Sequence, residues 1–257
     1  MEKLKMKKSF VCSMAALCAV MVSGAELFQE DVVAPFVPGG HCAKPAAKVL
    51  KLDDLHGDGS NGYALRINAR EKDDLNRLPF EIATAKCSYD NDYFYASMTA
   101  NDSEVYTEAT GDNQNLRGLG DTFSIFIRPE KSVAMWEICV TPNGKRFCHY
   151  YPGPGNMVMD FAEKCPVDGI KVKTAIDGKL NCRKVDDKAW TVSVAIPRKI
   201  FAAKGFKFVP QENWQIIFVR INFSTKLLAK ESSSFPQSAR NFFDANRYAA
   251  LKFGAVK

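Results

Sequence analysis

The stretch Ala189-Trp-Thr-Val-Ser-Val-Ala-Ile196 decides the fold of this chain, because large apolar residues alternate along it with small or polar ones. Trp190, Val192, Val194 and Ile196 all fall on one side of the alternation. Successive side chains of a β-strand point to opposite faces, so this period predicts a strand with one buried face. We therefore expect Trp190 in the core.

Short segments of the same kind fill most of the chain. Strands are predicted over residues 64–68, 82–88, 93–99, 122–127, 136–141, 146–151, 170–176, 214–222 and 250–253. A helix is predicted only at residues 198–204, as one or two turns after Pro197. Many short strands without interleaved helices favour an all-β fold, an antiparallel and jelly-roll-like β-sandwich. No repeat or linker divides residues 26–257, so we expect a single domain, with Trp214 in its core.

Residues 1–25 have the features of a secretory signal peptide. Four lysines open the segment, an apolar run over residues 10–22 follows, and Ser23-Gly24-Ala25 supplies the small residues of a cleavage site before Glu26. Cleavage near Ala25 predicts a secreted, periplasmic or cell-surface protein. The alternative is an uncleaved anchor helix.

The composition is that of a globular protein. Of 257 residues, 46% are hydrophobic and 25% are charged, which excludes a disordered chain. The formal net charge of +6 falls to +3 when the leader takes away four Lys and one Glu. This weak charge implies no nucleic acid partner. The only long apolar run is the leader, so we expect no membrane insertion after cleavage.

Six of the eight cysteines lie beyond the leader, which favours disulfides in an exported chain. They are Cys42, Cys87, Cys139, Cys148, Cys165 and Cys182. The chain has no CxxC motif, and its three histidines (His41, His56 and His149) are scattered, which argues against a zinc site.

A hairpin is predicted around Pro142-Asn143-Gly144-Lys145. If the turn centres on Asn143-Gly144, Cys139 lies opposite Cys148 with Cα atoms about 4.5 Å apart, within the disulfide range. A type I turn with a bulged Gly144 would shift the register by one residue and place the two sulfurs on opposite faces. The apolar alternation favours the first register and a Cys139–Cys148 disulfide. The remaining cysteines are paired as Cys165–Cys182 and Cys42–Cys87, although no pattern decides this.

Sequence motifs of catalysis are absent. The chain has no GxSxG elbow, phosphate-binding loop, HExxH or dinucleotide fingerprint, and Ser232-Ser-Ser234 reads as a polar loop. Adjacent acids at residues 53–54, 73–74 and 186–187 are of the type that glycosidases use in pairs, but such neighbours on loops are usually solvated. A non-enzymatic role is favoured. The alternative is a glycoside hydrolase whose carboxylates are brought together by folding.

Four segments, in order, resemble the family 9 carbohydrate-binding module. They are Cys87–Ala96 followed by Ala100-Asn-Asp102, Gly120–Pro129, Trp136–Gly144, and Trp190–Pro197 with its continuation Trp214–Asn222. The resemblance covers about residues 82–253. It implies a β-sandwich that binds an oligo- or polysaccharide without cleaving it, in proteins that degrade polysaccharides.

The resemblance also indicates candidate residues. Pyranose rings present C–H faces that pack on aromatic rings, while their hydroxyls need polar partners. The carbohydrate-binding candidates are Tyr150, Tyr151, Phe235, Arg220 and Trp136. Arg220 is equally well explained as half of a structural ion pair, and Trp136 as a core residue. Relatives can carry calcium, for which the candidates are Asp90, Asp92 and Asp102; turn formation is the other explanation, and no further cofactor is expected.

Two departures from the family pattern weaken the predicted site. Ser124 stands where the family has Glu, and Phe235 stands where relatives have Trp before a proline. A structural sandwich that has lost sugar binding is therefore a further alternative.

Overall fold

The computed structural model describes residues 31–38, 62–68, 81–153, 162–225, 231–238 and 241–254. The predicted signal peptide, His41, Cys42, His56 and the acids at 53–54 and 73–74 lie outside these ranges. No helix in the ranges is long and apolar enough to cross a membrane.

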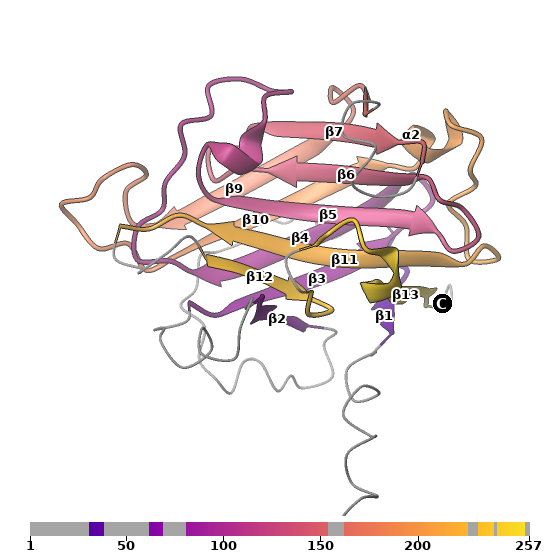
Figure 1. Ribbon diagram of the computed structural model, residues 1–257, viewed down its shortest axis with the longest axis horizontal. Coiled ribbons are helices and arrows are strands. Elements are labelled where there is room, and N and C mark those ends of the chain that lie inside the picture. Colours follow the sequence, from indigo (N-terminus) through magenta and orange to yellow (C-terminus); the bar gives the residue numbers. More distant parts are fainter. Residues whose placement is uncertain are drawn as a thin grey trace, which may run out of the picture.

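Two layers of β-strands form the molecule (Figure 1). The first layer has the order β8 (Glu163–Lys164), β7 (Arg146–Tyr151), β6 (Met135–Val140), β5 (Thr122–Pro129), β11 (Trp214–Asn222) and β12 (Glu231–Phe235). The second has the order β2 (Tyr63–Ile67), β3 (Ala83–Tyr89), β4 (Tyr93–Asn101), β10 (Ala189–Pro197) and β9 (Lys171–Asp177). Neighbouring strands in these two orders pair in antiparallel fashion, as predicted.

Among the described strands, pairing joins the two layers on one side. Strand β2 pairs with β12 of the first layer and with β3 of the second, so the sheet curls over continuously there. Strand β13 (Ala249–Phe253) adds to β11, and β1 (Val32–Ala34) pairs with β13 in parallel. At the other side, β8 and β9 end the strand order without pairing to each other. We call this side the seam.

The core lies between the layers. Trp190 and Trp214 are fully buried in it, which confirms their predicted role. Along β10, Trp190 faces Ala100 of β4, and Val194 faces Ala96, so large side chains have small cross-strand neighbours. This alternation of size lets the two layers interdigitate at the density of a protein interior.

Short helical pieces complete the fold. The predicted helix after Pro197 is a single turn, α2 (Lys199–Ala202). Short 3-10 turns cover Leu116–Gly118 and Ala245–Arg247.

The Ser232–Ser234 segment corrects a sequence prediction. It lies in the buried strand β12 and not in a polar loop. Two of its three hydroxyls bond to Asn68, because Asn68 Nδ2 donates to Ser232 Oγ at 3.1 Å and Ser234 Oγ donates to Asn68 Oδ1 at 2.8 Å. Paired in this way, polar side chains can be buried without an unsatisfied donor.

The β6–β7 hairpin adopts the bulged register. Ile138 faces Cys148, and Cys139 faces Phe147. Gly144 has φ of +80° and donates its N–H to Thr141 O at 2.9 Å, which makes the type I turn with a bulged glycine. The predicted Cys139–Cys148 disulfide is therefore wrong, because the extra residue turns the two side chains to opposite faces.

The predicted Cys165–Cys182 pairing also fails. Cys165 precedes β9 and Cys182 follows it, so the seven-residue strand holds them about 20 Å apart. Disulfides require Cα atoms within about 7 Å. Both residues are free thiols in the structure.

Candidate functional site

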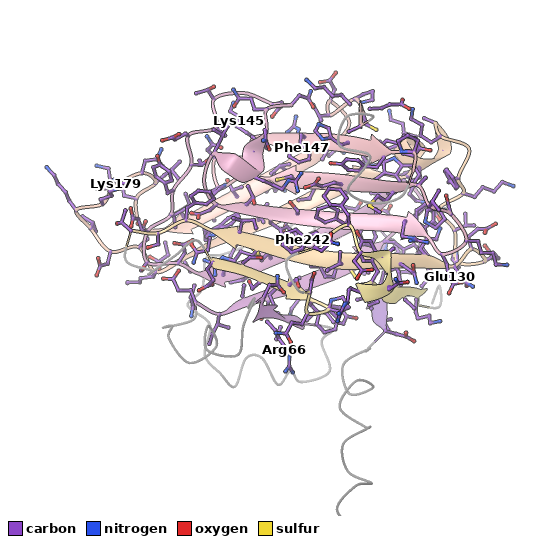
Figure 2. All side chains as sticks on the ribbon, in the orientation of Figure 1. Arg66, Glu130, Lys145, Phe147, Lys179 and Phe242 are labelled. Atoms are coloured by element: carbon purple, nitrogen blue, oxygen red, sulfur yellow. The ribbon has the colours of Figure 1, made fainter. Side chains whose placement is uncertain are left out.

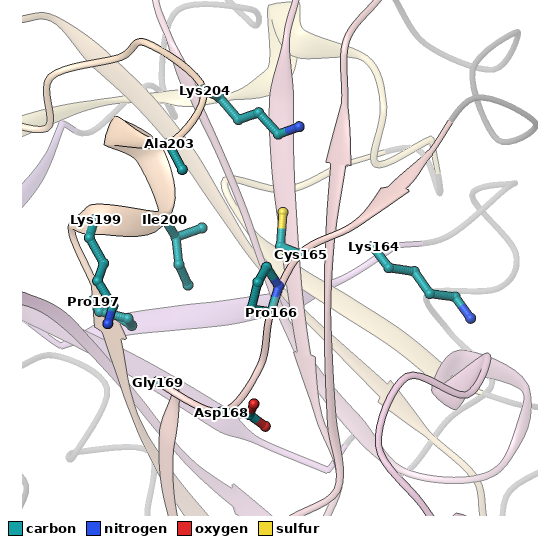
Figure 3. Close-up of a pocket in the computed structure, with 10 residues that line it drawn as sticks. All are labelled: Lys164, Cys165, Pro166, Asp168, Gly169, Pro197, Lys199, Ile200, Ala203 and Lys204. Atoms are coloured by element: carbon teal, nitrogen blue, oxygen red, sulfur yellow. The ribbon is translucent and has the colours of Figure 1, made fainter.

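A pocket of about 630 Å³ lies at the seam, where the chain crosses from β8 in one layer to β9 in the other. One wall is this crossing segment, and the other is the end of β10 with α2 (Figure 3). The lining residues are Lys164, Cys165, Pro166, Asp168, Gly169, Pro197, Lys199, Ile200, Ala203 and Lys204. We call this hollow the seam pocket.

The walls combine apolar and charged groups. Pro166, Pro197 and Ile200 give hydrocarbon surface, and Asp168 and Lys199 are exposed at the rim. Lys204 extends from the end of α2 toward Cys165 in Figure 3, whereas Lys164 points away. An apolar surface with a few polar groups is the composition of small-ligand sites, whose volumes run from about 300 to 1,000 Å³.

Lys204 links the pocket to its surroundings. Its Nζ donates to Glu163 Oε2 at 2.5 Å, and this hydrogen bond raises the pKa of Lys204. The same ammonium group lies 4.8 Å above the Tyr150 ring, as a cation–π contact. Lys204 is therefore held protonated at the edge of the pocket.

Tyr150 is the predicted aromatic that lies next to this pocket. Its ring is partly buried beneath Lys204 and packs on Trp136 with centroids 4.9 Å apart. Trp136 itself is fully buried, where it contacts Phe201 of α2 at 5.1 Å. Burial raises the pKa of Tyr150, so the phenol stays neutral at physiological pH.

Tyr151 and Phe235 lie elsewhere. Tyr151 points to the opposite face of β7, is 1% exposed, and donates its hydroxyl to Glu137 Oε2 at 2.9 Å. Phe235 is 9% exposed and packs against Tyr63 with ring centroids 5.0 Å apart. The structure thus brings Tyr150 and Trp136 together, leaves Tyr151 in a second apolar cluster, and places Phe235 three strands away from Trp136.

Arg220 is fully buried between the layers. It contacts Asp102 at 3.0 Å and Glu231 at 3.9 Å, and its Nη1 and Nη2 donate to the carbonyls of Glu81 and Asn101 at 2.8 Å. Burial disfavours its charge, but the surrounding carboxylates outweigh this and raise its pKa. This arrangement is the structural ion pair that was the alternative explanation for Arg220.

The calcium candidates do not converge. Asp90 accepts hydrogen bonds from the N–H of Asp92 and of Tyr93, at 2.9 and 2.7 Å, and so shapes the β3–β4 turn. Asp102 lies at the other end of β4, whose nine residues span about 30 Å. Within the described ranges, no group of three or more His, Cys, Asp or Glu side chains could hold a metal ion.

The lining residues of the pocket were missed by the sequence analysis, with the exception of Cys165, which was considered only for disulfides. Asp168, Lys199 and Lys204 are charged residues of short connections, and nothing in their spacing distinguishes them from ordinary surface positions. The signal that could have directed attention there is Pro197 followed by a single helical turn.

This two-layer antiparallel sandwich is similar in fold to solved structures of carbohydrate-binding proteins. The chain aligns with a Bacteroides uniformis protein to which carbohydrate binding has been ascribed, with TM-score 0.63, 14% identity, and coverage of 86% of this chain and 97% of that one. It also aligns with a family 9 carbohydrate-binding module from Caldicellulosiruptor kristjanssonii. The cellotriose complex of that module gives TM-score 0.50 and 10% identity over 89% of this chain and 95% of that one. Its glucose complex gives TM-score 0.51 and 9% identity over 89% and 97%. No family model matches the sequence, and no curated protein matches it significantly.

Proposed function

We propose that this chain is a secreted, non-catalytic carbohydrate-binding protein that holds a saccharide in the seam pocket. The observation that carries the proposal is the pocket itself, which sets hydrocarbon surface beside charged hydrogen-bonding groups. The similarity of fold to carbohydrate-binding modules supports it. Export would follow from the predicted leader, and such a protein would serve in the use of extracellular polysaccharides.

The pocket groups match the two kinds of surface on a sugar. The C–H face of a pyranose would lie on Pro166, Pro197 and Ile200, where burial of apolar area is favourable. Asp168 would accept hydrogen bonds from ring hydroxyls, and Lys199 would donate to hydroxyl or carbonyl oxygens. A small number of such charge-assisted bonds fixes the orientation of the ligand.

Aromatic stacking would come from Tyr150. Its ring adjoins the pocket beneath Lys204, and a displacement of that flexible side chain would expose the ring face to a second sugar unit. Tyr150 is therefore the aromatic candidate that we retain for the site.

Calorimetric titration of the purified chain, after a glycan array has identified its ligand, tests the proposal. We expect Asp168→Ala and Lys199→Ala each to weaken binding about tenfold, or about 1.4 kcal/mol. Lys179→Ala is the matched control, because Lys179 is exposed at the β9–β10 connection, at the end of the molecule opposite to α2 (Figures 1 and 2). This variant should bind like the wild type.

A second candidate function is a structural sandwich without sugar affinity. Burial of Tyr151, Phe235 and Arg220 favours it, since none of these can reach a ligand in the structure. Folded protein that binds no glycan at about 1 mM or better would select this alternative. Release of shorter sugars from a bound glycan would instead indicate hydrolysis, and would end the non-catalytic proposal.

A further inference from the structure

Cys148 and Cys165 lie directly opposite each other across two strands. Strand β7 pairs with β8 through His149↔Lys164, and continuing this register by one residue aligns Cys148 with Cys165. The backbone confirms the alignment, because Cys165 N–H donates to Cys148 O at 2.7 Å. Opposed residues that share such a bond have Cα atoms about 5.5 Å apart, within the range of disulfides.

The two side chains also face the same way. Both belong to the apolar cluster between the layers, with Cys148 0% and Cys165 6% exposed. Their thiols interact directly. A hydrogen bond from the Cys148 thiol lowers the pKa of Cys165 and raises that of Cys148, and Lys204 lowers the pKa of Cys165 further.

The other described cysteines have different surroundings. Cys139 packs on the opposite face of the first layer with Leu116 and Phe147. Cys87 lies on β3, where its sulfur donates to Val33 O at 3.6 Å. Cys182 lies beyond the far end of β9. Cys148 and Cys165 are thus the pair that the fold itself brings together in the described part of the chain.

We propose that Cys148 and Cys165 form a disulfide that ties β7 to the wall of the seam pocket once the chain meets a disulfide-bearing oxidant. Cys165 lines the pocket, so its thiolate attacks one sulfur of the oxidant, forms a mixed disulfide and releases one thiol. Cys148 then attacks the Cys165 sulfur and releases the second thiol. The two protons of the protein thiols end on the two released thiols, and the oxidant is reduced as the cysteine pair is oxidised.

The order of these steps follows from access. Of the two, Cys148 has no exposed surface and Cys165 lines the pocket, so Cys165 meets the oxidant and Cys148 acts as the resolving thiol. Thiol–disulfide exchange needs a thiolate with access to the disulfide, and Cys165 is favoured on both counts, because its pKa is lowered and it lines the pocket. This inference is independent of the proposed function.

Native oxidation of the reduced full chain with glutathione disulfide tests the proposal. After the remaining thiols are alkylated in denaturant, peptide mapping should recover a cross-linked peptide that joins Cys148 to Cys165. Cys139 should escape oxidation and be recovered in alkylated form, because burial raises the pKa of its thiol to about 12. Recovery of both Cys148 and Cys165 as alkylated thiols, or of either one linked to another cysteine, would overturn the proposal.

Single variants separate this pair from nonspecific oxidation. In Cys148→Ser, glutathione should stay trapped on Cys165 as a mixed disulfide, and in Cys165→Ser, Cys148 should remain unmodified. Cys139→Ser should still form the cross-link. Cys148→Ala offers a second variant if the serine disturbs folding, and equal glutathione uptake by the Cys148 and Cys165 variants would reject the assigned order.

Discussion

Arg220 brings a permanent charge into the space between the two layers, where Asp102, Glu81 and Glu231 lie within 4 Å of its guanidinium nitrogens. Removal of a buried charge costs much more than removal of an exposed one, because the partners left behind have no solvent to stabilise them. The residue therefore holds the ends of β4 and β11 together and contributes to the stability of the whole core. From the sequence alone, a ligand contact and an ion pair were equally good explanations for Arg220. The burial of its side chain between the layers decides in favour of the ion pair.

We predict that Arg220→Met lowers the free energy of unfolding by about 3–5 kcal/mol, because it leaves several buried carboxylates without their cation. Arg183→Met is the matched control. Its ion pair with Glu104 is 2.9 Å long, but the arginine side chain is 61% exposed, and such surface pairs contribute at most about 1 kcal/mol. Urea denaturation of both variants measures the difference. Equal losses would show that the buried network is not a major source of stability.

At the scale of elements, the β6–β7 hairpin depends on one glycine. Gly144 has φ of +80°, and a side chain in this left-handed region costs about 1–2 kcal/mol. We expect Gly144→Ala to lower the free energy of unfolding by this amount, as measured by thermal or urea unfolding. Gly111→Ala is the control, because a Cβ there meets nothing within 4 Å and the residue has no positive φ. A loss shared equally by both variants would contradict the strain argument.

The positions of the strands could be predicted from the sequence wherever apolar and polar residues alternate along it. The 214–222 segment matches β11 at both ends, and the 189–196 segment differs from β10 by one residue. Strand β12 was missed because its serines are buried, and two of them form hydrogen bonds with Asn68. Asn68 precedes Ser232 by 164 positions and Ser234 by 166, so no local sequence pattern records these contacts. The hairpin register was misjudged for a similar reason. A bulged glycine adds one residue to one strand, and the alternation on either side does not reveal it.

At the scale of the whole molecule, the seam pocket results from the topology. It is formed where the curled sheet does not close, from a crossing segment and a helical turn that are about 30 residues apart in sequence. The sequence indicated aromatic residues as candidates, and of these Tyr150 adjoins the pocket. The positions of Asp168 and Lys199 depend on how the two layers meet, so their role could not be inferred before the fold was known.

Buried carboxylates should also set how the stability of the molecule depends on pH. Burial raises the pKa of Glu231 to about 7 from its ordinary 4.5, with the Arg220 charge opposing and the Glu81 charge adding to the shift. Between these values the folded state binds more protons than the unfolded state, so the contribution of this group to stability is complete below about pH 4.5 and is lost as pH rises through about 7. Asp102, whose pKa burial raises to about 6, acts in the same direction.

Glu231→Gln isolates this effect, because it removes the titration and keeps the shape of the side chain. We expect the free energy of unfolding of this variant, relative to the wild type, to increase by on the order of 2 kcal/mol from pH 4.5 to pH 7.5. Glu212→Gln is the control for the amide substitution itself, because the side chain of Glu212 is exposed and lies outside the buried network. Urea unfolding curves at several pH values measure both differences. A flat difference for Glu231→Gln would mean that Arg220 keeps the carboxylate ionised in the folded state, and that the charge network spanning the two layers is balanced without a bound proton.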